Sequence, residues 1–250
     1  MNIALITGGS RGLGKSMAEH LAKRGIDSII TYNAQKEAAD SVVAEIRAKG
    51  RKATALQLDV TKHQSFEGFA VAVKSALSTH WGRSDFDYLV NNAGMSVYAP
   101  IADTSEDAFD QMVSAHLKAP FFLTQKLLPL IKDGGRIVNI SSGLARFSYP
   151  GYAAYAMMKG GIEVFTHYLA KELGSRRITA NSIAPGAIET DFGGGAVRDN
   201  KELNQMIAAQ TALGRVGQPG DIGGAVAAFL SDENGWINGQ RIEVSGGVHL

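Results

Sequence analysis

Short apolar runs alternate with longer amphipathic stretches from one end of the chain to the other. The runs that predict buried strands are Ile3–Thr7, Ser28–Tyr32, Ala53–Leu58, Tyr88–Asn91, Arg136–Ile140, Thr179–Ala184 and Arg241–Val244. The stretches between them predict helices at about 12–24, 34–49, 62–80, 105–131, 152–174 and 219–231. This alternation is typical of βαβ units, whose parallel strands are covered by helices on both faces. The pattern therefore predicts an α/β fold with a doubly wound, seven-stranded parallel sheet.

No shift in composition, repeat or linker interrupts this rhythm, so we expect residues 1–250 to form a single domain. The only long segment without a clear pattern is Gly186–Asn200, which contains three consecutive glycines at 193–195. Long irregular segments in compact domains are usually functional loops or disordered. We expect a substrate loop at about 186–210.

Composition and charge favour a small-molecule partner. The chain has 25 Lys and Arg against 24 Asp and Glu, for a net charge of +1. Without a basic cluster, it lacks the electrostatic signature of a protein that binds nucleic acid or an anionic membrane. It has no cysteine and no apolar run near 18 residues, and it begins without a basic leader. These features predict a cytoplasmic protein that needs no disulfide.

A glycine-rich segment connects the first predicted strand to the first helix. It reads Thr7-Gly8-Gly9-Ser10-Arg11-Gly12-Leu13-Gly14. A bound diphosphate needs backbone N–H donors and a helix N-terminus close by, and glycines remove the Cβ atoms that would obstruct this approach. A tight turn alone also uses glycines, but the strand before and the helix after favour a dinucleotide site.

Four further motifs accompany this loop. They are Asn91-Asn92-Ala93-Gly94, Ser142, Tyr155-x-x-x-Lys159, and Pro185-Gly186 with Thr190. Together with the Gly-x-x-x-Gly-x-Gly spacing, they resemble the classical short-chain dehydrogenase/reductase family over the whole chain, and most closely its 3-oxoacyl-[acyl-carrier-protein] reductases. The resemblance implies a Rossmann-type fold and a carbonyl or alcohol oxidoreductase.

The chemistry of carbonyl reduction agrees with these residues. The developing alkoxide needs a proton, and a tyrosine with its usual pKa near ~10 donates poorly at neutral pH unless a cation assists it. Tyr155 and Lys159 share one face of a helix because they are four residues apart. The resemblance implies that Tyr155 is the acid/base, that Lys159 binds the nicotinamide ribose and lowers the Tyr155 pKa, and that Ser142 polarises the carbonyl.

The segment after the second strand predicts the cofactor. It reads Thr31-Tyr32-Asn33-Ala34-Gln35-Lys36, without the carboxylate that would bind a ribose 2′-hydroxyl. Arg11 resembles the basic residue that binds a 2′-phosphate, and Lys36 is a second candidate. We expect NADP(H) to be preferred, with NAD(H) as the alternative. The predicted cofactor-binding residues are Gly8, Ser10, Arg11, Gly12, Leu13, Gly14, Asn33, Asp59, Val60, Asn92, Ala93, Gly94, Tyr155, Lys159, Pro185, Gly186, Ile188 and Thr190.

Two positions depart from the family pattern. His116 stands where the family has an asparagine that holds a water of a proton relay, and Ser245 stands where Asp is usual. A neutral imidazole can hold a water because it has one donor and one acceptor nitrogen. We therefore interpret His116 as a neutral relay residue, with a packing residue turned away from the site as the alternative.

The substrate pocket is the least readable part of the sequence. Leu144, Phe147, Tyr149 and Tyr152 are assigned to its wall or to the core, and Phe192 to its loop side. Ser141 is a weaker candidate than Ser142, because neighbours in an extended segment point to opposite sides. The six histidines have no metal-ligand spacing, and we expect no metal.

The functional prediction is an NADPH-dependent reductase of a ketone or aldehyde. The alternatives are an NAD-dependent alcohol dehydrogenase and a non-catalytic dinucleotide-binding protein. The modest basic clusters at 131–136 and 175–177 do not favour docking of an acyl carrier protein. By resemblance, the helices at 105–131 and 152–174 and the segment Gly239–Leu250 form subunit contacts of a homotetramer.

Overall fold

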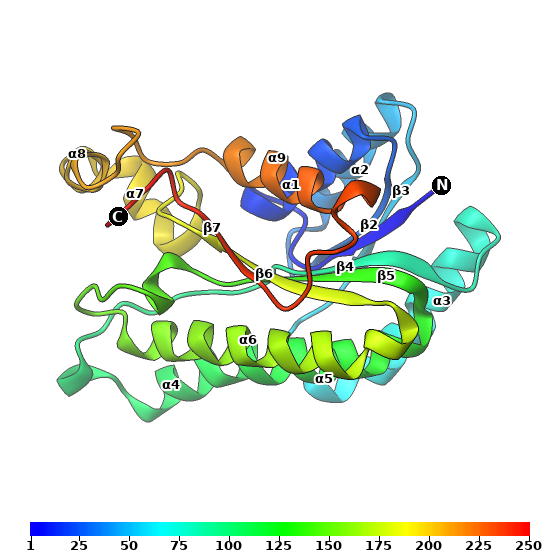
Figure 1. Cartoon of the computed structure of the whole chain (residues 1–250), viewed down its shortest axis with the longest axis horizontal. Helices are drawn as coiled ribbons and strands as arrows, with labels where there is room; N and C mark the ends of the chain where they lie inside the picture. The colour runs from blue at the N-terminus through cyan, green and yellow to red at the C-terminus, as the bar shows by residue number, and fades with distance from the viewer.

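The computed structural model describes all residues from 1 to 250 and contains one seven-stranded sheet (Figure 1). The strand order is β3-β2-β1-β4-β5-β6-β7, and every neighbouring pair is parallel. The strands are β1 (Ile3–Ile6), β2 (Asp27–Tyr32), β3 (Ala53–Gln57), β4 (Phe86–Asn91), β5 (Ile131–Ile140), β6 (Thr179–Pro185) and β7 (Arg241–Val244). The predicted Rossmann-type sheet is confirmed.

Nine α-helices accompany the sheet. They are α1 (Gly12–Lys23), α2 (Lys36–Ala48), α3 (Phe66–Trp81), α4 (Glu106–Val113), α5 (Ala119–Leu127), α6 (Ala153–Glu172), α7 (Ala196–Asp199), α8 (Lys201–Ala209) and α9 (Pro219–Phe229). Helices α1, α2 and α9 lie on one face of the sheet, and α3 to α6 lie on the other (Figure 1). No helix has both the length and the apolar character needed to cross a membrane.

Two hydrophobic cores follow from the alternation of side chains along the strands. In β1, Ala4 and Ile6 belong to the core under α1, α2 and α9, whereas Ile3 and Leu5 belong to the core under α3, α5 and α6. All four are fully buried. A strand buried on both faces reads as a continuous apolar run, which is why the sequence revealed it.

The carboxyl ends of the central strands lie at one edge of the sheet, because the last few residues of neighbouring strands pair with each other. Ile6 pairs with Val90, and Val90 pairs with Val138. The order of strands reverses between β1 and β4, and open α/β sheets bind ligands at such a point beyond the carboxyl ends of the strands. The glycine loop, the Asn91–Gly94 motif and Ser142 all follow strands at this edge.

Two predicted segments were wrong in detail. The helix predicted over 105–131 is divided by a π-helical turn at Ser114–Lys118, and it ends before β5, which begins at Ile131. Its apolar positions satisfy a helical period on both sides of the π turn, so periodicity alone could not reveal the extra residue. The segment Gly186–Asn200, predicted to be irregular, contains a short helical turn at Phe192–Gly195 and all of α7.

Candidate functional site

A cleft of about 600 Å³ opens at the carboxyl edge of the sheet. Its lining includes the glycine loop, the ends of β2, β4, β5 and β6, and residues of the 186–210 segment. Nearly half of the lining residues are hydrophobic, 21 of 43. A site of this size with polar groups at one end and apolar walls at the other suits a cofactor together with a substrate.

The glycine loop is shaped to receive a diphosphate. Gly8 and Gly12 have positive φ angles of 67° and 54°, and both line the cleft beside Ser10 and Leu13. Gly14, the last glycine of the loop, does not line the cleft. A Cβ at Gly14 would lie 2.2 Å from the Gly8 carbonyl oxygen, so this glycine allows α1 to pack against the loop.

The adenosine end of the cleft has one candidate cation. Arg11 lines the cleft, is largely exposed and lies 3.8 Å from the Asp191 carboxylate. Such an exposed pair is weak, so the guanidinium remains able to bind a phosphate. Lys36 was the second candidate, but it lies outside the cleft lining and is paired with Asp40 at 2.6 Å.

Apart from Gly14, every predicted cofactor residue lines the cleft. These residues are Gly8, Ser10, Arg11, Gly12, Leu13, Asn33, Asp59, Val60, Asn92, Ala93, Gly94, Tyr155, Lys159, Pro185, Gly186, Ile188 and Thr190. The glycine-rich loop, the weakly paired Arg11 guanidinium and the absence of a carboxylate at the end of β2 fit a dinucleotide that carries a 2′-phosphate.

Tyr155 and Lys159 lie together on α6, as predicted. The Lys159 Nζ is 5.3 Å from the centre of the Tyr155 ring, and it donates a hydrogen bond of 2.7 Å to the Ile140 carbonyl oxygen. Burial lowers the pKa of Lys159 to about 7. Desolvation acts against the charged form of any group, and for lysine that form is the protonated one.

The predicted lowering of the Tyr155 pKa by Lys159 is not seen. Burial raises the pKa of the Tyr155 hydroxyl, and only contact with the Ser142 hydroxyl acts in the opposite direction. The Lys159 Nζ donates to the Ile140 carbonyl oxygen and lies 5.3 Å from the centre of the Tyr155 ring, so it makes no hydrogen bond to the phenolic oxygen.

Ser142 is oriented by the short helical turn that follows it. Its Oγ accepts a hydrogen bond of 3.2 Å from the Leu144 N–H and so caps the turn at Gly143–Ala145. Because the oxygen accepts from the backbone, the hydroxyl hydrogen is available to donate, and the Tyr155 hydroxyl lies within its reach. The neighbouring Ser141 points into the protein and donates to Glu163, which agrees with its lower rank in the sequence analysis.

His116 lies in the π-helical turn, buried against the site. Its ring stands perpendicular to the Tyr155 ring, with the centres 5.3 Å apart. Its Nε2 lies 2.6 Å from the Met95 carbonyl oxygen, so Nε2 carries the hydrogen and Nδ1 is the acceptor. Burial, assisted by the Lys159 charge, lowers the pKa of His116 to about 3. The imidazole is therefore neutral at physiological pH, as expected.

A second, much smaller cavity lies behind the cleft. It measures about 20 Å³, and its lining includes Asn91, His116, Asn139 and Lys159. The Asn91 Oδ1 has no hydrogen-bond partner although the atom is buried. A polar cavity of this size accommodates one water molecule.

Aromatic side chains dominate the apolar end of the main cleft. The predicted residues Leu144, Phe147, Tyr149, Tyr152 and Phe192 all line it. The sequence analysis missed the C-terminal residues Val248 and His249, whose side chains complete one wall. It also missed Tyr98, whose ring supports that of Tyr152 at 5.3 Å. No local pattern distinguishes these residues, because only the tertiary fold brings them to the cleft.

Comparisons with known proteins decide the family. The family described as enoyl-(acyl carrier protein) reductase matches residues 8–249. The tetrahydroxynaphthalene reductase PfmaG of Pestalotiopsis fici is 38% identical over 256 residues, which cover 98% of this chain and 90% of PfmaG. The chain belongs to the short-chain dehydrogenase/reductase family. The resemblance inferred from the sequence is thus confirmed.

Two solved structures are similar throughout. The promiscuous reductase LugOII, which catalyses keto-reduction at C1 in lugdunomycin biosynthesis, superposes with a TM-score of 0.93 at 37% identity, covering 98% of this chain and 96% of LugOII. The angucycline C-6 ketoreductase LanV with bound NADP also gives 0.93, at 34% identity, covering 98% and 95% of the two chains. The predicted activity is confirmed: the chain is an NADP(H)-dependent oxidoreductase that reduces a carbonyl group.

Replacement of Arg11 tests the basis of the cofactor preference. We expect the wild-type protein to prefer NADPH over NADH at least about tenfold in kcat/KM, equivalent to about 1.4 kcal/mol. Arg11→Ala should bring the two cofactors close to parity, mainly through a higher KM for NADPH, because a cation that binds the 2′-phosphate is lost. Lys36→Ala is the matched control and should leave the preference unchanged. Steady-state kinetics with both cofactors measure it, and an unchanged preference in Arg11→Ala would contradict the assignment.

Proposed function

We propose that this reductase acts on a ketone of a flat, fused-ring aromatic molecule. The observation that carries the proposal is the set of aromatic residues Phe147, Tyr149, Tyr152 and Phe192, which line the same cleft as Tyr155, with the centre of the Phe192 ring 5.9 Å from that of the Tyr155 ring. Aromatic walls favour flat aromatic ligands through offset and edge-to-face contacts. A second structure of LanV, with bound NADP and rabelomycin, is 35% identical to this chain and superposes with a TM-score of 0.89. Its ligand supports the same substrate class.

We assign the catalytic roles to three polar residues that line the cleft. The cofactor supplies the hydride when it is bound. Ser142 donates its hydroxyl hydrogen to the substrate oxygen, and Tyr155 gives the proton that turns the alkoxide into an alcohol. Lys159, with its pKa near 7, replaces that proton, because an acid of this pKa exchanges protons readily at neutral pH.

A panel of carbonyl compounds tests the proposed function. We expect NADPH oxidation to be fastest with fused-ring ketones of the tetralone type, with kcat/KM at least about tenfold above that for acyclic β-keto esters and acyl thioesters. The physical reason is that only the flat rings fill the aromatic walls. Preference for an acyl thioester would instead indicate a 3-oxoacyl reductase.

Tyr155→Phe is the control for this assay. The variant keeps the ring and the glycine loop but lacks the hydroxyl, so it should bind NADPH normally and lose more than about 95% of turnover. Fluorescence of bound NADPH measures the first property and the spectrophotometric assay the second. Substantial turnover by this variant would disprove the role of Tyr155.

We further propose that His116 anchors a water next to Lys159. The Nε2 hydrogen is engaged by the Met95 carbonyl, so only Nδ1 is available, and it accepts. The small cavity beside His116 is also lined by Asn91, whose buried Oδ1 has no hydrogen-bond partner. A water held by these groups can pass protons to Lys159, while the imidazole itself stays neutral.

Two substitutions test this role of His116. His116→Ala removes the acceptor and should lower kcat about fivefold or more, whereas His116→Asn restores an acceptor oxygen and should recover most of it. Steady-state kcat at pH 7 is the measurement. Equal kcat in the wild type and both variants would show that His116 only packs.

The pH dependence of unfolding supplies the control. His116 is neutral when folded, but below its ordinary value of 6.5 it binds a proton when unfolded. Its contribution to stability is therefore complete above pH 6.5 and is lost as the pH falls toward 3. At pH 5 the loss should be about 2 kcal/mol, given about 1.4 kcal/mol per pKa unit. In the His116→Asn variant, the free energy of unfolding should fall by about 2 kcal/mol less between pH 7 and pH 5 than in the wild type.

We also propose that the protein is a homotetramer. Large apolar side chains are exposed on α5 and α6, which lie on the same face of the sheet (Figure 1) and meet where the Phe121 and Phe165 rings are 5.1 Å apart. These residues are Phe121, Phe122, Met157, Val164 and Tyr168. A second copy related by a twofold axis would bury such a face against itself. Near the free edge strand β7, Trp236 is 98% exposed and provides a second apolar surface.

Light scattering at micromolar concentration tests the assembly. We expect four times the chain mass of 26.5 kDa. Val164→Asp should reduce the mass, because a charge would then be buried at the contact. Val71→Asp, at an exposed position of α3, is the control and should leave it unchanged. A wild-type monomer would contradict the proposal.

A further inference from the structure

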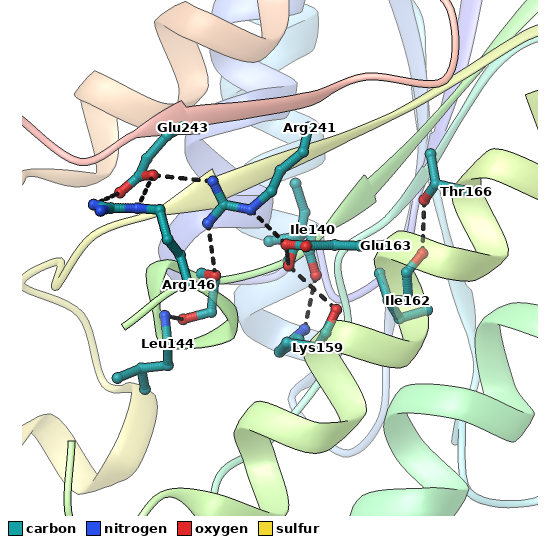
Figure 2. A network of polar contacts seen from close by, with 11 residues as sticks. Ile140, Leu144, Arg146, Lys159, Ile162, Glu163, Thr166, Arg241 and Glu243 are labelled. Atoms are coloured by element: carbon teal, nitrogen blue, oxygen red, sulfur yellow. Dashed lines mark hydrogen bonds and ion pairs between the residues drawn. The ribbon is translucent and has the colours of Figure 1, made fainter. Parts of the chain in front are cut away.

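Three consecutive residues at the end of β5 are each held by a different charged side chain (Figure 2). Lys159 Nζ donates to the Ile140 carbonyl oxygen at 2.7 Å. Ser141 Oγ donates to Glu163 Oε1 at 2.6 Å, and Arg241 Nη2 donates to the Ser142 carbonyl oxygen at 3.3 Å. The backbone that carries the proposed carbonyl-binding serine is therefore fixed from two sides, by α6 and by β7.

Glu163 extends the catalytic face of α6 by one turn. Tyr155, Lys159 and Glu163 follow one another at intervals of four residues and so lie in one row along the helix. Tyr155 and Lys159 face the cleft, whereas Glu163 reaches the strand end beneath it. The helix thus carries Tyr155 and Lys159 and also, through Glu163, holds the strand end next to Ser142.

Arg241 connects Glu163 to the C-terminal strand. Its Nε donates to Glu163 Oε1 at 2.7 Å and its Nη1 to Glu243 Oε2 at 3.0 Å. Glu243 also receives two hydrogen bonds from Arg146, at 2.7 and 2.9 Å. The result is a neutral chain of two arginines and two glutamates, whose side chains are between 18% and 38% exposed. Networks of this kind hold geometry better than isolated surface pairs.

Arg146, the last residue of this row of ion pairs, holds one wall of the cleft. Arg146 donates to the carbonyl oxygens of Val248 and His249, at 2.8 and 2.9 Å. The His249 ring in turn packs against Phe147, with the ring centres 4.6 Å apart. The same ion pairs therefore fix the C-terminal residues that line the cleft.

Ser142 needs this support because it lies just beyond the sheet. The last hydrogen bond that joins the end of β5 to β6 runs from the Ser141 N–H to the Ile183 carbonyl oxygen, at 2.7 Å. Beyond it, the Ser142 carbonyl accepts from Arg241 and, at 3.2 Å, from the Ala145 N–H of the following turn. Without Arg241, only that local turn would restrain the serine.

We propose that Arg241 is a positioning residue that acts through Ser142, by fixing the backbone from which the serine hydroxyl reaches the substrate oxygen. The inference rests on the proposed role of Ser142 in carbonyl binding. Arg241 itself is absent from the cleft lining, so it can act on the reaction only through the residues it holds. Its removal should therefore affect the chemical step and not the binding of NADPH.

A double-mutant cycle tests this coupling. Arg241→Met should lower kcat about tenfold when Ser142 is present, since small misplacements of a reacting group are costly. In the Ser142→Ala background the same change should lower kcat less than about twofold, because no hydroxyl remains to be positioned. Single-turnover absorbance of NADPH measures the slow variants, and fluorescence measures the Kd for NADPH, which should stay constant. Arg241→Lys keeps the charge and should recover part of kcat, and it can replace Arg241→Met in the cycle if that variant does not fold.

The control is an arginine with the same chemistry at the other end of β5. Arg176 is paired with Asp133 at 2.7 Å and donates to the Leu128 carbonyl oxygen at 2.9 Å. Arg176→Met should lower the free energy of unfolding without changing kcat. Equal effects of Arg241→Met in both serine backgrounds, or no effect in either, would overturn the inference. An unchanged kcat in Ser142→Ala alone would instead disprove the proposed role of the serine.

Discussion

The site depends on one buried ammonium group, that of Lys159. Removing an ammonium from water is costly unless it is hydrogen-bonded, and the protein gives this one a single partner, the Ile140 carbonyl oxygen. Ile140 is the last residue of β5, so this bond joins α6 to the end of the strand. Any shift of the helix along the sheet would leave the ammonium without a partner. Tyr155, one turn earlier, is therefore fixed by the same constraint.

The sequence predicted those parts of the fold and site whose signal is local. β1 was found because each of its residues is buried on one face or the other. The glycine loop and the Tyr155–Lys159 pair were found because a backbone turn and one helical turn each fit within eight residues. In these segments, the neighbours along the chain are also the neighbours in space, and spacing alone carries the geometry.

The remaining features depend on contacts between distant residues. Arg146 meets Glu243 across 97 positions, and Arg241 meets Glu163 across 78. Charged residues at such separations have no periodic pattern, and most charges of this kind are simply solvated. The π-helical turn at Ser114–Lys118 was hidden for a different reason. It inserts one residue into an otherwise regular helix, and the apolar pattern before and after it stays helical.

The walls of the cleft differ in how firmly they are held. The residues assigned to the reaction lie on one wall, and part of the predicted substrate loop forms another. The Ser142 carbonyl oxygen accepts a hydrogen bond from Arg241, and the Tyr152 ring is supported by that of Tyr98. The opposite wall instead follows Gly193, Gly194 and Gly195, all with positive φ, a conformation that other residues rarely adopt. Across this segment Arg198 pairs with Asp191 and Asp199, and because these ion pairs are exposed they are weak. The groups assigned to the chemistry therefore lie on the wall held by partly buried contacts, whereas the segment expected to contact the substrate lies on the wall held by exposed ones.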